Sequence, residues 1–316
     1  MKQIIFLLFP GFEIMDFAGP LQTFSEAKNH GCDLLVKFCS WQREICASQE
    51  VFINRLHYFS NINAQKNDII IIPGIEHKRY TDNGLNTVPK EVFAWLNNAY
   101  KNGTELCSIC SGAFVLAHAG LLNGKKCTTH WSRTDELQQA YPDVNVVANC
   151  IFIHGDGIYT SAGITSGIDL SLALVEKNWG PHVTSRVAKD LVVYIRRNSD
   201  HHQKSVYLDY REHFNPNIHK VQDWLISHPD KKYTLDVLAR RFGMSERNLT
   251  RLFKKATGIT IKQYATLITL EYAKNLLQNP NNTIESTALQ CGFHNARQLR
   301  RLWKTYFGTT PSQNRS

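Results

Sequence analysis

The sequence of 316 residues has no apolar run that approaches the length of a membrane span. Its first three residues are followed by a short apolar stretch, residues 4–9, which is too short for the core and cleavage site of a secretory signal peptide. Its eight cysteines lack the framework of a small secreted domain, so we expect reduced thiols. These absences predict a cytoplasmic protein with no membrane partner.

Acidic residues are scarce in the last third of the chain. From residue 215 on there are 16 Lys+Arg and 6 Asp+Glu, a net charge of +10, whereas residues 1–214 hold 20 and 21, a net charge of −1. The positive field therefore lies on the C-terminal part, where it favours binding of a polyanion. The length of 316 residues is enough for two domains of ordinary size.

One short pattern occurs twice within residues 234–311. The first half of the pattern returns 49 positions later and the second half 50 positions later. The matching pairs include Thr234 and Thr283, Ala239 and Ala288, Gly243 and Gly292, Ser245 and Asn295, Leu249 and Leu299, Phe253 and Trp303, and Gly258 and Gly308. Chance does not produce such a match, so the chain contains an internal repeat.

Each copy is typical of a helix-turn-helix. In the first copy, Thr234 and Ser245 are suited to accept hydrogen bonds at the starts of two helices. Gly243 between them suits the left-handed backbone position that ends a helix. Apolar residues recur at helical spacing on both sides of this turn, so each copy is expected to bury one face of each helix.

The outward faces of the two second helices carry basic, amide and hydroxyl side chains, which are suited to DNA bases and phosphates. They are Arg247, Asn248, Thr250, Arg251 and Lys254 in the first copy, and Arg297, Gln298, Arg300, Arg301 and Lys304 in the second. The alternative interpretation is a small helical bundle with a solvated basic face.

With its apolar linking helix at residues 261–277 and its terminal Gly308-Thr309-Thr310-Pro311, this double unit resembles the AraC/XylS class of bacterial transcription regulators. The resemblance implies an all-α domain of two helix-turn-helix units whose second helices enter successive major-groove segments of double-stranded DNA. We assign residues 217–316 to this domain and the polar, His-rich residues 198–216 to a linker.

Strands and helices alternate over the first two-thirds of the chain. Apolar runs at residues 4–9, 68–72 and 105–109 are typical of strands that are covered on both faces. Further strands are predicted at residues 33–39, 126–131, 144–148, 151–154 and 158–161, and helices at 16–29, 91–100, 112–119, 168–176 and 183–196. This alternation predicts an α/β sandwich with a mainly parallel sheet.

Cys110 lies where the predicted strand at 105–109 turns into a helix, an elbow that exposes its side chain at the carboxyl edge of the sheet. The helix N-terminus would favour the thiolate, so Cys110 is expected to react with alkylating reagents faster than the other seven thiols. A free cysteine is also often a small buried hydrophobe, and both interpretations stay open. Cys107, on the strand itself, is expected to lie in the core rather than to form a redox pair.

Five motifs surround this elbow in order along the chain. They are residues 4–20, Ile72-Pro73-Gly74, Ile109-Cys110-Ser111-Gly112, Thr128-Thr129-His130-Trp131 and residues 163–169. Together they resemble the PfpI/ThiJ-like superfamily, related to class I glutamine amidotransferases, over residues 1–197. Among enzymes, the pattern resembles that of isocyanide hydratase. The resemblance implies a flavodoxin-like fold with a reactive thiol at Cys110, a carboxylate beside it at Asp16, and His130 near the pocket.

Chemistry suggests a role for each of these groups. Cys110 would be the nucleophile or ligand contact, and Asp16 would hold or donate a proton at the thiol. Backbone N–H groups near Gly74 and Ser111 would bind an oxyanion or carbonyl. His130 is either a base or a structural wall of the pocket. The bulky residue after Pro73-Gly74, where enzyme-like relatives carry a small one, counts against turnover.

The sequence therefore predicts a DNA-binding transcription regulator, expected to be a homodimer. Its N-terminal pocket beside Cys110 would sense a small nitrogen-containing or amide-like metabolite, with no metal and no cofactor. Chains that join these two kinds of domain resemble a known class of amidotransferase-like transcription regulators. Two alternatives stay open: a Cys-dependent hydratase or amidase fused to a DNA-binding module, and a thiol redox sensor.

Overall fold

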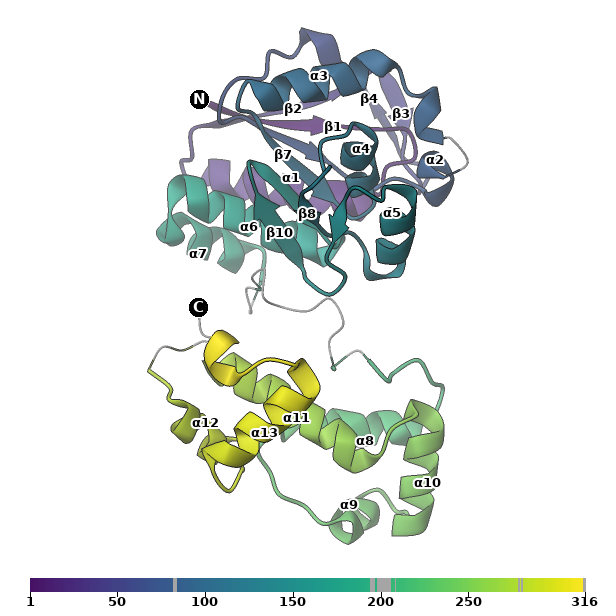
Figure 1. Ribbon diagram of the computed structural model, residues 1–316, viewed down its shortest axis with the longest axis vertical. Helices are drawn as coiled ribbons and strands as arrows, with labels where there is room; N and C mark the ends of the chain where they lie inside the picture. The colour runs from purple at the N-terminus through teal and green to yellow at the C-terminus, as the bar shows by residue number, and fades with distance from the viewer. Residues whose placement is uncertain are drawn as a thin grey trace. The chain divides into compact units, whose positions relative to one another are not determined.

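The computed structural model describes residues 1–81, 84–193, 197, 206–207, 209–277, 279 and 281–314. The chain forms two compact units, unit 1 at Met1–Gln203 and unit 2 at Lys204–Ser316 (Figure 1). Of the predicted linker, residues 198–205 and 208 lie outside the described residues. Val206, Tyr207 and Tyr210 pack in or against an apolar core of unit 2, so this part of the predicted linker is attached to that unit.

A seven-stranded sheet in the order β10-β11-β7-β6-β1-β2-β5 forms the centre of unit 1. Its strands are β1 (Lys2–Leu7), β2 (Leu34–Ser40), β5 (His57–Tyr58), β6 (Ile69–Ile72), β7 (Glu105–Ile109), β10 (Phe152–Gly155) and β11 (Ile158–Ser161). Every pairing is parallel except that of β10 with β11. The predicted flavodoxin-like, mainly parallel α/β sheet is confirmed.

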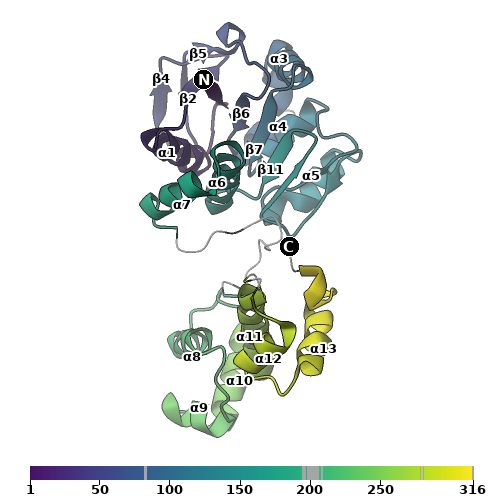
Figure 2. The same ribbon diagram turned by 90° about the vertical axis from the view of Figure 1, so that its left-hand side faces the viewer.

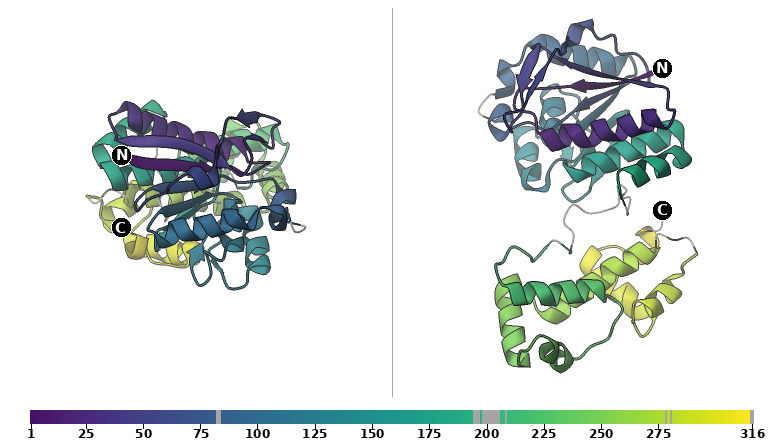
Figure 3. Two further views of the ribbon diagram at one scale, coloured as in Figure 1. Left: turned by 90° about the horizontal axis from the view of Figure 1, so that it is seen from above. Right: turned by 180° about the vertical axis from the view of Figure 1, so that it is seen from behind.

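Continuous apolar sequence makes the central strands, because both faces of the sheet are covered. β6 consists of four isoleucines that are at most 1% exposed. Helices α1 (Ile14–Asn29), α6 (Thr165–Trp179) and α7 (Pro181–Asp190) lie on one face of the sheet, and α3 (Lys90–Lys101) and α4 (Gly112–His118) lie on the other (Figures 2 and 3).

Short elements complete unit 1. β3 (Glu44–Cys46) pairs with β4 (Phe52–Asn54), β8 (Lys126–Cys127) pairs with β9 (Asn145–Val146), and the short helices are α2 (His77–Tyr80) and α5 (Thr134–Ala140). The predicted helix at 183–196 is shorter in the structure, where α7 ends at Asp190. Val192 has a positive φ of 56°, which helical backbone does not allow, and residues 194–196 lie outside the described residues.

Unit 2 is helical where the structure describes it. Its α-helices are α8 (Pro216–Ser227), α9 (Leu235–Arg241), α10 (Glu246–Thr257), α11 (Ile261–Leu277), α12 (Ile284–Gln290) and α13 (Ala296–Phe307). The apolar residues form two clusters, one for each helix-turn-helix copy, and α11 contributes residues to both. The repeat in the sequence is therefore a repeat in the structure.

The predicted helix starts and turns of the repeat are present. The side chains of Thr234 and Ser245 accept backbone N–H groups at the starts of α9 and α10. Gly243 and Gly292 have φ values of 66° and 75°, the left-handed positions that favour glycine. Within the described parts of the chain, no helix combines the length and apolarity that a membrane span requires.

Candidate functional site

The elbow after β7 has the geometry that the sequence predicts. Cys110 has a positive φ of 53°, which is uncommon for a residue with a side chain. Its N–H donates to the carbonyl oxygen of Ser161 at 2.9 Å, and Thr129 Oγ1 donates to its carbonyl oxygen at 2.8 Å. A Cβ on Gly112 would lie 2.4 Å from the carbonyl oxygen of Ile72, so the elbow requires glycine there. These contacts fix the thiol at the edge of the sheet.

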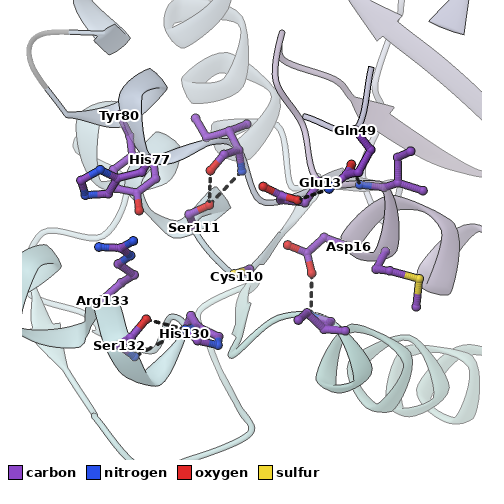
Figure 4. Close-up of a pocket in the computed structure, with 14 residues that line it drawn as sticks. Glu13, Asp16, Gln49, His77, Tyr80, Cys110, Ser111, His130, Ser132 and Arg133 are labelled. Carbon is purple, nitrogen blue, oxygen red and sulfur yellow. Dashed lines mark hydrogen bonds between the residues drawn. The ribbon is translucent and has the colours of Figure 1, made fainter. Parts of the chain in front are cut away.

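A pocket of about 530 Å³ opens beside Cys110. Figure 4 shows the acidic side chains of Glu13 and Asp16 on one side of Cys110, and Tyr80, His77 and Arg133 on the other. Glu136 pairs with both Arg133, at 3.3 Å, and His77, at 3.0 Å. The pocket thus has hydrogen-bond acceptors at one end and donors at the other.

Asp16, in the first turn of α1, is 1% exposed. Its Oδ1 accepts the N–H of Ile164 at 2.5 Å, while Oδ2 makes no hydrogen bond of good geometry in the described part of the chain. Burial raises the pKa of Asp16 to about 6, and the Ile164 N–H and the Cys110 thiol oppose this rise without cancelling it. A Cβ on Gly74 would lie 2.2 Å from Oδ2, so only glycine fits at that position.

The pKa of the Cys110 thiol is shifted in the opposite direction to the one that its position at a helix N-terminus predicts. Burial raises its pKa well above the usual range, and the charge of Asp16 raises it further. The backbone N–H of Ser111 acts in the opposite direction but is the weaker influence. The prediction of a stabilised thiolate is therefore wrong, because the burial of Cys110 away from water outweighs the effect of the helix N-terminus. At neutral pH the negative charge of this pair resides on Asp16.

His130 is held as a neutral hydrogen-bond donor. Its Nδ1 lies 2.8 Å from Ser132 Oγ and accepts the Ser132 N–H at 3.4 Å, which assigns the proton of the neutral ring to Nε2. Burial lowers the pKa of His130, and Arg133 lowers it further. This arrangement favours a polar wall of the pocket over a general base.

The polar groups near Gly74 and Ser111 already interact in part with other groups of the protein. Ser111 Oγ accepts the N–H of Ile75 and donates to its carbonyl oxygen, each at 2.8 Å, so this hydroxyl fixes the turn after β6. The Gly74 N–H acts on the Asp16 carboxylate, and the Ser111 N–H acts on the thiol. Of the two predicted amides, that of Ser111 is the better placed to meet a ligand atom at the sulfur.

Cys107 lies in the core, as expected, with no exposed surface. All eight cysteines are unpaired. Several pocket residues were not predicted from the sequence, namely Glu13, Gln49, His77, Tyr80, Arg133 and Ile164. Glu13 and Ile164 lie within motifs that the sequence singles out, and Arg133 follows another by two residues. Gln49 lies in a loop, and His77 and Tyr80 lie on the short helix α2, where the sequence has no clear pattern.

The basic side chains of the repeat face solvent. Arg247, Arg251, Arg297 and Arg301 are exposed, while Leu249, Phe253, Leu299 and Trp303 beneath them have no exposed surface. Lys254 and Lys304 are exposed as well. The alternation of buried and exposed positions on α10 and α13 therefore agrees with the sequence prediction.

Some of the predicted DNA-facing side chains are engaged within unit 2. Asn248 Oδ1 accepts from Arg251 at 3.0 Å, and Thr250 donates to the backbone of α10. Gln298 Oε1 accepts the His294 N–H at 3.0 Å, where it helps to cap α13. Arg300 pairs with Glu285 at 2.8 Å. Among the described residues, Arg297 and Arg301 have no ion-pair partner.

Two family models match the chain: the DJ-1/PfpI family over residues 2–177 and a helix-turn-helix domain over residues 238–316. The chain belongs to the DJ-1/PfpI family. In this DJ-1/PfpI protein the second region is a helix-turn-helix domain of the AraC type, so both resemblances drawn from the sequence are confirmed.

Relatives support this assignment along the whole chain. The protein is 30% identical over 319 residues to the HTH-type transcriptional regulator CdhR of Pseudomonas aeruginosa, covering 98% of this chain and 90% of CdhR. It is 26% identical over 180 residues to the isonitrile hydratase of Pseudomonas putida, covering 55% of this chain and 71% of the hydratase.

A solved structure shows the same fold. The crystal structure of a ThiJ/PfpI family protein from Pseudomonas syringae matches 63% of this chain and 78% of its own, with a TM-score of 0.53 and 21% identity. At that identity the likeness establishes the fold of the DJ-1/PfpI unit and no more.

Proposed function

We propose that this DJ-1/PfpI protein is a DNA-binding transcription regulator whose pocket beside Cys110 binds a small-molecule effector. The observation that carries the DNA-binding part is the pair of exposed basic faces on α10 and α13, each backed by its own apolar cluster. Similarity to CdhR over nearly the whole of both chains supports the same function.

Each of the two second helices carries two kinds of basic side chain with different tasks in this proposal. Arg297 and Arg301 of α13, which have no ion-pair partner within the described residues, are suited to guanine edges. Arg247 and Arg251 provide the equivalent positions on α10. Lys254 and Lys304, near the helix ends, are suited to phosphates, which fix the register without reading sequence.

The pocket is suited to a small nitrogen-containing or amide-like effector. The buried Oδ2 of Asp16 makes no hydrogen bond of good geometry in the described part of the chain and can accept one, and Asp16 lies on the acidic side of the pocket with Glu13. Arg133 and the Nε2–H of His130 are donors elsewhere in the lining. An N–H group at the first end and a carbonyl oxygen at the second would satisfy both.

The proposal is tested with a duplex enriched from a random-sequence pool on the full chain. Its dissociation constant is then measured with and without a panel of small amides and amines. We expect at least one amide or amine to change the affinity of the wild type and to leave that of Asp16→Ala unchanged. Failure to enrich any duplex would contradict the DNA-binding part, and a panel without effect, or with the same effect on Asp16→Ala, would contradict the effector part.

A homodimer is also part of the proposal, since two copies of unit 2 would contact a longer site. Sedimentation equilibrium of the full chain should give twice the mass of 36.1 kDa. A monomer at micromolar concentration would contradict it.

A second candidate function is hydration of an isonitrile. Similarity to isonitrile hydratase and the Cys110–Asp16 pair favour it. In this reaction water adds to the isonitrile carbon and the product is a formamide. Formation of the N-alkylformamide from an alkyl isonitrile by the full chain, abolished in Cys110→Ser, would establish it. A peroxide sensor is less well supported, because the thiolate is the reactive form and burial disfavours it here.

A further inference from the structure

The turn between β11 and α6, residues 163–165, packs directly against the elbow. A Cβ built on Gly163 would lie 2.4 Å from Cβ and 2.7 Å from Sγ of Cys110. The next residue, Ile164, donates its N–H to Asp16, and its side chain lines the pocket. A ligand seated between Cys110 and Asp16 therefore meets this turn.

Ile164 holds an unusual backbone conformation. Its φ is 49° and its ψ is −111°, a combination that a β-branched residue avoids. Its side chain is 48% exposed, so core packing does not account for the strain. Its N–H donates to the buried Asp16, and its carbonyl oxygen accepts the Gly167 N–H at 3.1 Å, so hydrogen bonds hold the residue on both sides. Strain of this kind persists only where surrounding contacts determine it, and it is common at switch regions.

The other end of the same turn forms a hydrogen bond with Arg197, near the C-terminal end of unit 1. Thr165, the first residue of α6, accepts a hydrogen bond from Arg197 Nη2 at 2.8 Å. One turn further along α6, Asp169 accepts from Nη2 of the same arginine at 2.6 Å and from Nε at 3.0 Å. The backbone N–H of Arg197 also donates to Asp169, at 3.2 Å.

This contact is well built for an anchor. The Asp169 side chain is 4% exposed; its Oδ2 accepts from both Nε and Nη2 of Arg197, and its Oδ1 accepts the Arg197 backbone N–H. Arg197 shortly precedes Lys204, the first residue of unit 2. Arg197, the last described residue before unit 2, is therefore held by the start of α6, at Thr165 and Asp169.

We propose that residues 163–165, together with Asp169 and Arg197, are a coupling element between the pocket and the DNA-binding unit. This inference rests on the proposed function. A ligand that takes the place of the Ile164 N–H at Asp16, or displaces the Ile164 side chain, releases the strained turn. The start of α6 then loosens its hold on Arg197, the last described residue before unit 2, and the affinity of the full chain for DNA changes. Such a ligand shifts the balance because it binds the released arrangement better.

Two variants of the full chain act on opposite ends of this element. Ile164→Gly relieves the backbone strain, because glycine adopts positive φ freely, and so it stabilises the held arrangement. Asp156→Gly is its matched control, because Asp156 also has a positive φ, of 50°, and is exposed on a turn that does not line the pocket. Arg197→Ala removes the anchor. Arg186→Ala is its control, because Arg186 is exposed on α7 and has no ion pair among the described residues.

Affinity for the enriched duplex is the main measurement. We expect Ile164→Gly and Arg197→Ala to change it in opposite directions, each by about fivefold or more, and both controls to change it by less than about twofold. In the double variant, the affinity should equal that of Arg197→Ala alone, since the turn then has nothing to act on. The thermal unfolding midpoint of each variant shows whether it is folded, so that a change in affinity is not mistaken for a loss of folded protein.

The result that would overturn the coupling element is specific. An Ile164→Gly effect of equal size with and without Arg197 would show that the turn acts by another route, while the proposed function would stand. The coupling element would also be overturned if neither Ile164→Gly nor Arg197→Ala changed the affinity for the duplex. The proposed function fails separately, if the wild type enriches no duplex or responds to no effector.

Discussion

The pocket of unit 1 and the basic face of unit 2 hold their charges in opposite environments. Asp16 is 1% exposed, and burial raises its pKa to about 6. Arg297 and Arg301 stand in solvent on α13. Charge in the pocket is therefore costly and depends on every neighbour, whereas charge on the helices is nearly independent of the rest of the protein. A ligand in the pocket can therefore change the charge state of Asp16, whereas the charges of the basic face stay the same whether or not a ligand is bound.

The largest expected effect is the pH dependence of Asp16. The ordinary pKa of an aspartate in water is 3.8, and that of Asp16 in the folded protein is about 6, so the folded state binds more protons between these values. Stability therefore falls as pH rises from about 4 to 6, and above that the charged carboxylate costs about 3 kcal/mol. Urea unfolding of wild type and Asp16→Asn across this range should show that slope only in the wild type. Parallel stability curves would contradict the buried-charge account.

On the exposed face, single substitutions should act on binding and spare the fold. Arg301→Ala should lower affinity for the enriched duplex by about 1–3 kcal/mol if it reads a guanine. Arg251→Ala should cost less, because Arg251 is already bonded to Asn248. Fluorescence anisotropy on the same duplex measures both. Equal and negligible losses would remove these two side chains from the interface.

A smaller effect concerns the reactivity of Cys110. Asp16→Asn removes the neighbouring negative charge, so the pKa of the thiol should fall and its alkylation by iodoacetamide at pH 7.5 should quicken by at least about threefold. Cys46, which is partly exposed and does not line the pocket, is an internal control within the same protein. Mass spectrometry follows both sites. Unchanged labelling of Cys110 would show that Asp16 does not govern the thiol.

The smallest effect should come from the exposed ion pair of Arg300 and Glu285. Both side chains are about half exposed or more, so Glu285→Ala should change stability by at most about 0.5 kcal/mol. The same change frees Arg300, and DNA affinity should rise slightly. A stability loss above about 1 kcal/mol would show that surface charge here is not independent of the fold.

Local pattern explains why so much of unit 2 could be predicted. Thr234, Ser245 and Gly243 act through their own helices and turns, so sequence spacing alone locates the two copies. The central strands of unit 1 were equally clear, because strands buried on both faces are apolar throughout. Short elements such as β3 and β4, of three residues each, have too little pattern to be found.

The chemistry of the pocket needed the tertiary structure. The strand-to-helix elbow locates Cys110 in the sequence. The direction of its pKa shift could not be predicted, because the Asp16 carboxylate and the residues that bury the thiol come from distant segments. Asp16 and Ile164 are bonded across 148 positions of the sequence. No local pattern states how deeply such a pair is buried, and burial decided the sign.

The most direct test of the whole account is a hydroxyl-radical footprint of the full chain on its enriched duplex. The wild type should protect two segments about one helical turn, roughly 10 base pairs, apart on one face of the DNA. The double variant Arg297→Ala/Arg301→Ala should lose one segment, and Arg247→Ala/Arg251→Ala should lose the other. A single protected segment in the wild type, or two segments untouched by both double variants, would contradict DNA binding by the paired helices.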